Sequence, residues 1–198
     1  MRILKQLLTL PFVAILLAAG SSPDNSLLSN PGFEFPAVKG DAASTDQPEK
    51  WQVFGHENDP VKIELSTAVA NTGSQSVHIA SNSVKDSYQG LSQQIHVDAG
   101  KGYQFSAAFR NDSAAPLSGT ERGQISIEWK ADDGRELDRT WGPDVGASLA
   151  PDHWTVLKMD GTAPPDSVDA VFVITFHEGA DPKTGAFFVD DAAASERQ

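Results

Sequence analysis

The chain of 198 residues contains no cysteine. The lack of thiols excludes disulfide bonds, thiolate-ligated metals and cysteine nucleophiles. Other enzyme motifs are missing as well: the five histidines form no HExxH pattern, and there is no G-x-S-x-G elbow and no phosphate-binding loop. We therefore do not expect an enzyme. A small polysaccharide-acting enzyme, with a site assembled from distant residues, is the alternative left open.

Positive charge is scarce. Fifteen Lys and Arg residues stand against 27 Asp and Glu residues, which gives a formal net charge of −12. A field of that sign repels phosphate backbones and anionic lipid headgroups. We expect no nucleic-acid partner and no membrane binding through a basic patch.

A hydrophobic run long enough to span a membrane is also missing. The most apolar segment, Leu7–Ala19, is shorter than the roughly 20 residues that a spanning helix needs. It follows Arg2 and Lys5 and leads into the small residues AAGS at 18–21, which is the pattern of a secretory signal peptide. We predict a signal peptide at residues 1–20, export to the periplasm or the medium, and no membrane insertion after cleavage. An uncleaved N-terminal anchor is the alternative.

The exported part shows no sustained helical periodicity. Short strand-like runs recur instead, separated by Gly, Pro, Asn and Asp. These runs cover residues 51–54, 61–65, 76–80, 91–97, 103–109, 125–129, 136–141, 154–157, 171–176 and 187–189. The pattern predicts an all-β fold, a two-sheet antiparallel β-sandwich of jelly-roll type. Its length suits one domain at residues 27–193, with a flexible arm at 21–26 and a tail at 194–198.

Alternation within these runs separates an inner from an outer face. Ile125, Ile127 and Trp129 share one face, opposite Glu128, and Asp132–Gly134 forms a tight turn after them. The continuously apolar run at 171–176 predicts a strand buried on both faces.

Four short motifs follow one another along the exported part. They are NPGFE at 30–34, GSQSV at 73–77, QQIHVDAGKGY at 93–103 and VDD at 189–191. In this order and spacing they resemble carbohydrate-binding modules of the family 4, 9, 16 and 22 type, from about Leu27 to Asp191. The resemblance implies a galactose-binding-like jelly roll that binds a polysaccharide or oligosaccharide without catalysing a reaction.

The resemblance also implies one structural calcium ion. Its pattern carries over to the carboxylates of Glu34 and Asp190 and to backbone carbonyls near Gly73 and Gln75. Hard oxygen ligands of this kind suit calcium. The alternative is that Glu34 and Asp190 are ordinary solvated residues at strand ends.

A glycan site needs exposed aromatic rings and polar partners for sugar hydroxyls. Trp141 ends a polar strand and Tyr88 lies in a polar stretch, so we expect both rings to be exposed. Arg110 and Glu128 lie opposite core-facing residues of strands expected to be neighbours. We assign all four to ligand binding, although an exposed ion pair is the simpler reading of Arg110 and Glu128.

The sequence thus predicts a secreted, non-catalytic carbohydrate-binding module with a structural calcium. A lone module of this type suggests a separate enzyme or an envelope component as a further partner. The alternative from a different class is an exported structural or adhesion protein that binds a protein or envelope partner through the same sandwich.

Overall fold

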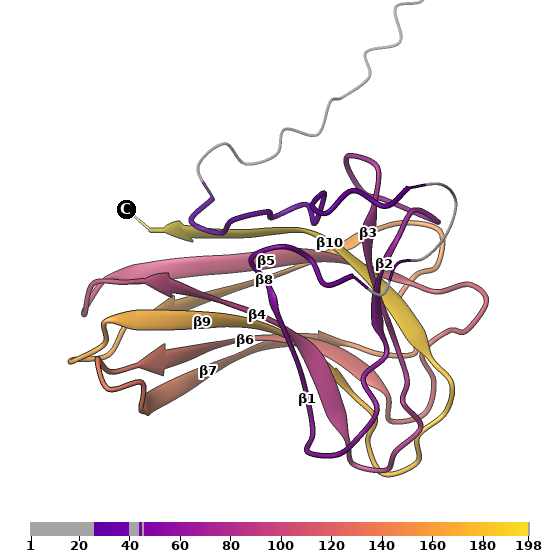
Figure 1. Cartoon of the computed structure of the whole chain (residues 1–198). Coiled ribbons are helices and arrows are strands. Elements are labelled where there is room, and N and C mark those ends of the chain that lie inside the picture. Colours follow the sequence, from indigo (N-terminus) through magenta and orange to yellow (C-terminus); the bar gives the residue numbers. More distant parts are fainter. Residues whose placement is uncertain (1–25, 40–43, 45, 198) are drawn as a thin grey trace, which may run out of the picture.

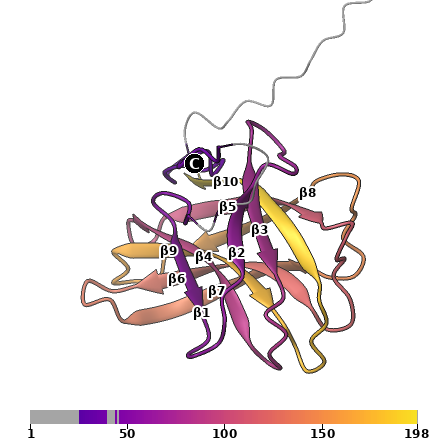
Figure 2. The same ribbon diagram turned by 45° about the vertical axis from the view of Figure 1, so that its right-hand side comes forward.

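The computed structural model describes residues 26–39, 44 and 46–197. Ten strands form two antiparallel five-stranded sheets stacked face to face (Figures 1 and 2). No helix occurs in the described part, and none of it could span a membrane as a helix. The predicted β-sandwich is confirmed. The predicted signal peptide and residues 21–25 of the predicted arm lie outside the described residues.

The first sheet carries the strands that later form the candidate site. Its order is β1 (Gln52–Gly55), β4 (Tyr88–His96), β9 (Asp169–His177), β6 (Arg122–Lys130) and β7 (Glu136–Val145). The second sheet has the order β2 (Ile63–Ser66), β3 (Ser76–Ala80), β10 (Ala186–Glu196), β5 (Gly102–Asn111) and β8 (Thr155–Thr162). Most neighbours in each sheet are distant in the sequence, so side chains from separate segments meet on one face.

The core lies between the sheets and follows the predicted alternation. Ile125, Ile127 and Trp129 of β6 are fully buried. Phe105 of β5 meets Phe172 of β9 across the interface, with ring centroids 4.9 Å apart. Truncating a buried aromatic side chain of this kind to alanine costs about 3–5 kcal/mol. The core therefore holds the two sheets at a fixed separation and orientation.

The strand β9 is buried on both faces over most of its length, as predicted. Its odd-numbered residues Val171, Val173 and Thr175 point out of the sandwich and line a hollow on the outer face of the first sheet. Val173 and Thr175 are nevertheless buried, at 4% and 8% exposed, and Val171 is half-buried.

The N-terminal segment lies along β10, as both ribbon views show (Figures 1 and 2). Leu27 N donates to Ala194 O at 2.8 Å, and Ala192 N donates to Pro31 O at 2.9 Å. Ser26 Oγ accepts from Ala194 N at 3.2 Å. Residues 194–196, expected in the tail, therefore belong to the last strand, and the start of the described chain is attached to its end.

Candidate functional site

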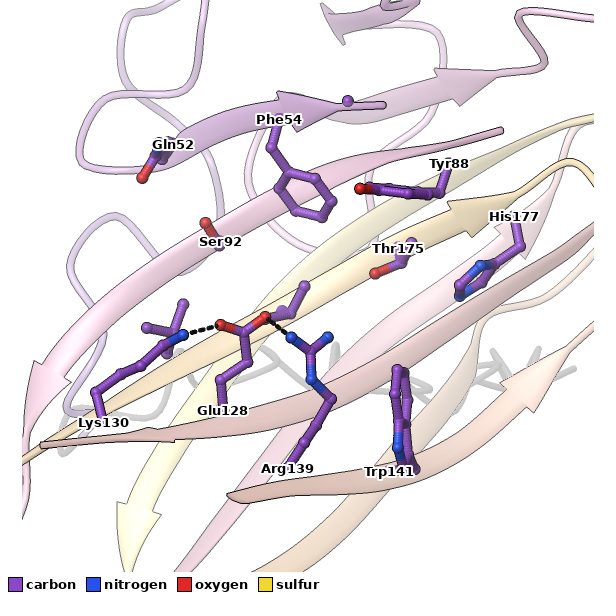
Figure 3. Close-up of a pocket in the computed structure, with 13 residues that line it drawn as sticks. Gln52, Phe54, Tyr88, Ser92, Glu128, Lys130, Arg139, Trp141, Thr175 and His177 are labelled. Atoms are coloured by element: carbon purple, nitrogen blue, oxygen red, sulfur yellow. Dashed lines mark ion pairs between the residues drawn. The ribbon is translucent and has the colours of Figure 1, made fainter. Parts of the chain in front are cut away.

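A cleft of about 650 Å³ opens on the outer face of the first sheet (Figure 3). The strand register explains its shape. One row across the sheet runs Gln52, Ser92, Val173, Ser126 and Trp141, from β1 at one edge to β7 at the other. The middle of this row consists of small side chains and its far end is a large ring. The central strands thus form a low floor, and the edge strands form the walls.

Two aromatic rings stand on opposite walls. Figure 3 shows Phe54 of β1 and Trp141 of β7 pointing into the cleft from opposite sides. The Phe54 ring packs close to the backbone of its cross-strand partner, Gly90. Only glycine leaves room for this, because a Cβ at position 90 would come within 2.7 Å of the ring. Trp141 is 59% exposed, as the sequence predicts. The two walls present apolar faces to whatever occupies the floor between them.

A cluster of four charged side chains lies at one end of the cleft, where β6 and β7 form a hairpin, and three of the four line the cleft. We call Glu128, Lys130, Glu136 and Arg139 the ionic tetrad. Lys130 Nζ lies 2.7 Å from Glu128 and 3.2 Å from Glu136. Arg139 pairs with Glu128 and, through Nε at 2.9 Å, with Glu136. Its hydrogen bond to Glu136 lowers the pKa of that carboxyl.

The ionic tetrad also positions the Trp141 ring. The guanidinium carbon of Arg139 lies 5.0 Å from the centroid of the Trp141 ring, a cation–π arrangement. Because Glu128 and Glu136 hold Arg139 in place, the guanidinium forms a fixed backing for an otherwise exposed ring. The wall is therefore partly ordered before any ligand binds.

The other end of the cleft is aromatic. Tyr88, 40% exposed, lies 6.4 Å from Phe54 and 5.4 Å from His56 between ring centroids. Its cross-strand neighbour on β9 is His177. Burial and then the nearby Arg122 charge lower the pKa of His177 to about 4. The imidazole is therefore neutral at neutral pH.

The structure brings together three of the four predicted ligand residues: Tyr88, Glu128 and Trp141 all line the cleft. Arg110 does not. It lies on β5 in the second sheet, where its Nε donates to Pro151 O at 2.9 Å. The expectation that Arg110 and Glu128 lie on neighbouring strands is wrong, because β5 and β6 are consecutive in the sequence but belong to different sheets.

Several cleft residues were missed from the sequence. Lys130 and Arg139 could have been found, because the turn at 132–134 sets Glu128 opposite Arg139 and Lys130 opposite Glu136. The structure also places His177 in the cleft. It buries Glu178 completely, where the carboxylate accepts hydrogen bonds of 2.6 Å from Ser81 Oγ and Asn82 N.

The residues predicted for calcium meet at one corner beside β10. Glu34 Oε1 accepts from Ser74 N at 3.0 Å and from Gln75 N at 3.3 Å. Asp190 Oδ2 accepts from Asn71 N at 2.7 Å. Gly73 has a positive φ of 65°, and a Cβ there would collide with the Glu34 carboxylate. The 71–75 loop thus bridges the two acids.

The donor chemistry of this corner fits calcium. A Cβ placed on Gly32 would lie 3.6 Å from Asp191 Oδ1, 4.0 Å from Asp190 Oδ1 and 3.8 Å from the Glu34 Cγ methylene, so the side chains of three acids lie close to this glycine. Asp190 is fully buried, and burial followed by the Asp191 charge raises its pKa to about 7. Among the described residues, no Lys, Arg or His forms an ion pair with any of the three.

Side chains alone do not complete a metal site there. In the described part of the chain, no group of three His, Asp or Glu residues is arranged to hold an ion. Calcium commonly takes six to eight oxygens, including backbone carbonyls. An ion at this corner would therefore need the loop carbonyls in addition to Glu34 and Asp190.

An antiparallel β-sandwich with an aromatic-walled cleft on one sheet is typical of domains that bind sugars. The sequence comparison agrees: residues 25–184 match the family described as carbohydrate binding domain. The chain belongs to this family. No curated protein sequence matches it.

Solved structures with the same fold are distant in sequence. TmCBM61 in complex with β-1,4-galactotriose is 16% identical, with a TM-score of 0.56 over 87% of this chain and 99% of that one. A Stig cyclase, FisC from Fischerella sp. TAU, is 14% identical, with a TM-score of 0.57 over 86% and 96%. The enzymatically active domain of bacteriophage CBA120 tailspike protein 4 is 13% identical, with a TM-score of 0.64 over 87%, and this chain spans 21% of its length.

Proposed function

We propose that this chain is an exported, non-catalytic carbohydrate-binding module that holds an uncharged polysaccharide or oligosaccharide in the cleft of the first sheet. The observation that carries the proposal is the pair of rings, Phe54 and Trp141, facing each other across a floor of small side chains. The apolar face of a sugar ring stacks on such rings, while its hydroxyls need nearby polar groups. The ionic tetrad supplies those groups at one end.

The preference for an uncharged glycan follows from the charges of the ionic tetrad. Its two cations, Lys130 and Arg139, are each paired with Glu128 and Glu136, so the four charges cancel. An acidic sugar would compete with these internal carboxylates and would approach a chain with a net charge of −12. A neutral sugar can accept from Arg139 and donate to Glu128 while the tetrad stays intact.

The tetrad also argues against catalysis. Glu128 is the one carboxylate among the described residues lining the cleft, whereas glycoside hydrolysis by the common route uses two. Both of its carboxylate oxygens form ion pairs, one with Lys130 and the other with Arg139. The similarity to a cyclase means that this fold can also carry catalysis. In this chain, however, the cleft carboxylate is engaged in ion pairs.

The proposal includes a structural calcium ion at the corner between Glu34 and Asp190. It is supported by a buried carboxylate without a cationic partner and by the donor chemistry of the corner. An ion there would link the described start of the chain to its last strand. Export rests on the signal-peptide pattern at residues 1–20.

The test is affinity electrophoresis of the purified chain through gels containing xylan, β-1,4-galactan, mixed-linkage β-glucan or polygalacturonate. We expect retardation by at least one of the three neutral glycans and none by polygalacturonate. Each neutral glycan is also incubated with a stoichiometric amount of protein, and we expect no new reducing ends. Absence of retardation by every neutral glycan contradicts the proposal, and retardation by polygalacturonate alone contradicts the preference for uncharged sugars.

A further inference from the structure

His177 has a polar atom that the protein itself leaves unsatisfied. Its Nε2 is buried and has no hydrogen-bond partner. No other described residue lining the cleft has such an atom. Buried polar atoms are nearly always hydrogen-bonded, and one left alone destabilises the folded state. An exception beside a cleft therefore suggests that the partner is a ligand.

The position of His177 in the sheet brings it within reach of a bound molecule. It pairs with Tyr88 on β4 and with Arg122 on β6, and Thr175 precedes it on the same face of β9. Figure 3 shows the imidazole pointing into the space between Thr175 and Trp141. A sugar stacked on the Trp141 ring would occupy that space.

The chemistry of a neutral imidazole suits a hydroxyl group. With the pKa lowered to about 4, one ring nitrogen donates and the other accepts at neutral pH. A sugar hydroxyl does both, so it can satisfy either tautomer. The charges of Arg122 and Asp144 act on the ring electrostatically, and these two side chains pair with each other at 3.8 Å.

We propose that His177 is a ligand-contacting residue of the cleft, whose Nε2 forms a hydrogen bond with a hydroxyl of the sugar seated against Trp141 and Thr175. This inference rests on the proposed glycan-binding function. It makes the aromatic end of the cleft a place where the glycan is recognised by hydrogen bonding as well as by stacking. Because Nε2 is buried in the free chain, the bond requires a local shift around His177 as the sugar packs against the Trp141 ring.

The experiment compares His177→Phe and His177→Gln with the wild-type chain. Phenylalanine keeps a planar ring of similar size but has no polar atom, whereas glutamine retains a donor and an acceptor. The probes are xylan, β-1,4-galactan and mixed-linkage β-glucan, and both the dissociation constant and the thermal midpoint are measured. His153→Phe, at an exposed position outside the cleft, is the matched control.

We expect His177→Phe to weaken binding about 3–10-fold, as for the loss of one neutral hydrogen bond. Its thermal midpoint should stay unchanged or rise, because the unsatisfied atom is removed. His177→Gln should recover part of the affinity, and His153→Phe should bind like the wild type.

Two results overturn the assignment of His177 alone: wild-type affinity in His177→Phe, or a parallel loss of affinity and stability that glutamine does not recover. Failure of the wild-type chain to bind any of the three glycans overturns the proposed function as well.

Discussion

Replacing Trp141 by alanine should separate binding from folding. The side chain is 59% exposed, so about 40% of its surface is buried. An aromatic side chain that buries 150–250 Å² when enclosed would here bury roughly 60–100 Å². At about 25 cal/mol per Å², truncation costs at most about 1.5–2.5 kcal/mol of stability. Because such area-based values are upper limits, we expect a loss nearer 1 kcal/mol.

The effect on glycan binding should be larger. Trp141 forms one wall of the cleft and is held against Arg139, so its loss removes an ordered stacking surface. Truncating an aromatic anchor of a binding site often costs about 2 kcal/mol or more, which is about 30-fold in affinity. A loss of binding free energy larger than the loss of folding stability distinguishes a binding residue from a core residue.

The assay measures denaturant unfolding and the affinity for whichever neutral glycan binds. Trp129→Ala provides the comparison, because that side chain is fully buried on the adjacent strand and should cost about 3–5 kcal/mol of stability. Phe35→Ala is the control for an exposed ring, since Phe35 is 61% exposed and lies outside the cleft. Our reasoning is refuted if Trp141→Ala unfolds the domain as Trp129→Ala does, or if it leaves affinity unchanged.

Three further predictions concern the metal, the tetrad and pH. Calcium added to chelator-treated protein should stabilise it by about 2.7 kcal/mol at a hundredfold excess over Kd, and Glu34→Ala or Asp190→Ala should abolish most of the gain in a thermal melt. Arg139→Met should leave Glu128 without one of its two cationic partners and so lower the free energy of unfolding by about 1–3 kcal/mol, measured by chemical unfolding. The same variant should weaken glycan binding, measured by titration calorimetry. As pH falls from 6.5 to 4, the unfolded state takes up the His177 proton before the folded state does, so the free energy of unfolding should fall by at most about 1.4 kcal/mol per pH unit. His177→Gln should flatten this pH dependence. Equal slopes in the variant and the wild type would contradict the lowered pKa of His177.

The fold could be predicted because its determinants are local. Alternation along a strand decides which side chains face the core, and the turn at 132–134 marks a hairpin regardless of the rest of the chain. Ile125, Ile127 and Trp129 are buried as that alternation requires. Glu34 and Asp190 were expected to meet only because of the resemblance to known modules, since nothing in their spacing of more than 150 residues brings them together.

The cleft could be predicted only in part, because sheet membership is not local. Alternation correctly placed Glu128 and Arg110 on outward faces, but it did not specify to which of the two sheets each face belongs. The connection between β5 and β6 crosses from one sheet to the other, which separates these two residues. In contrast, β9 lies between β4 and β6, and this long-range pairing brings Tyr88, His177 and Arg122 into one row. No pattern within a single segment carries that information.

The separation of the two sheets also determines what the proposed calcium ion can do. Asp190 lies on β10 of the second sheet, whereas Glu128 and Trp141 belong to the first, and neither Glu34 nor Asp190 lines the cleft. An ion between Glu34 and Asp190 would link residues distant in the sequence and would contact no bound sugar. Chelation should therefore lower the thermal midpoint but leave the affinity for a neutral glycan unchanged at temperatures where the chain stays folded. Titrations with and without chelator at 10 °C test this separation, and a large loss of affinity in a still-folded sample would mean that the metal corner shapes the cleft.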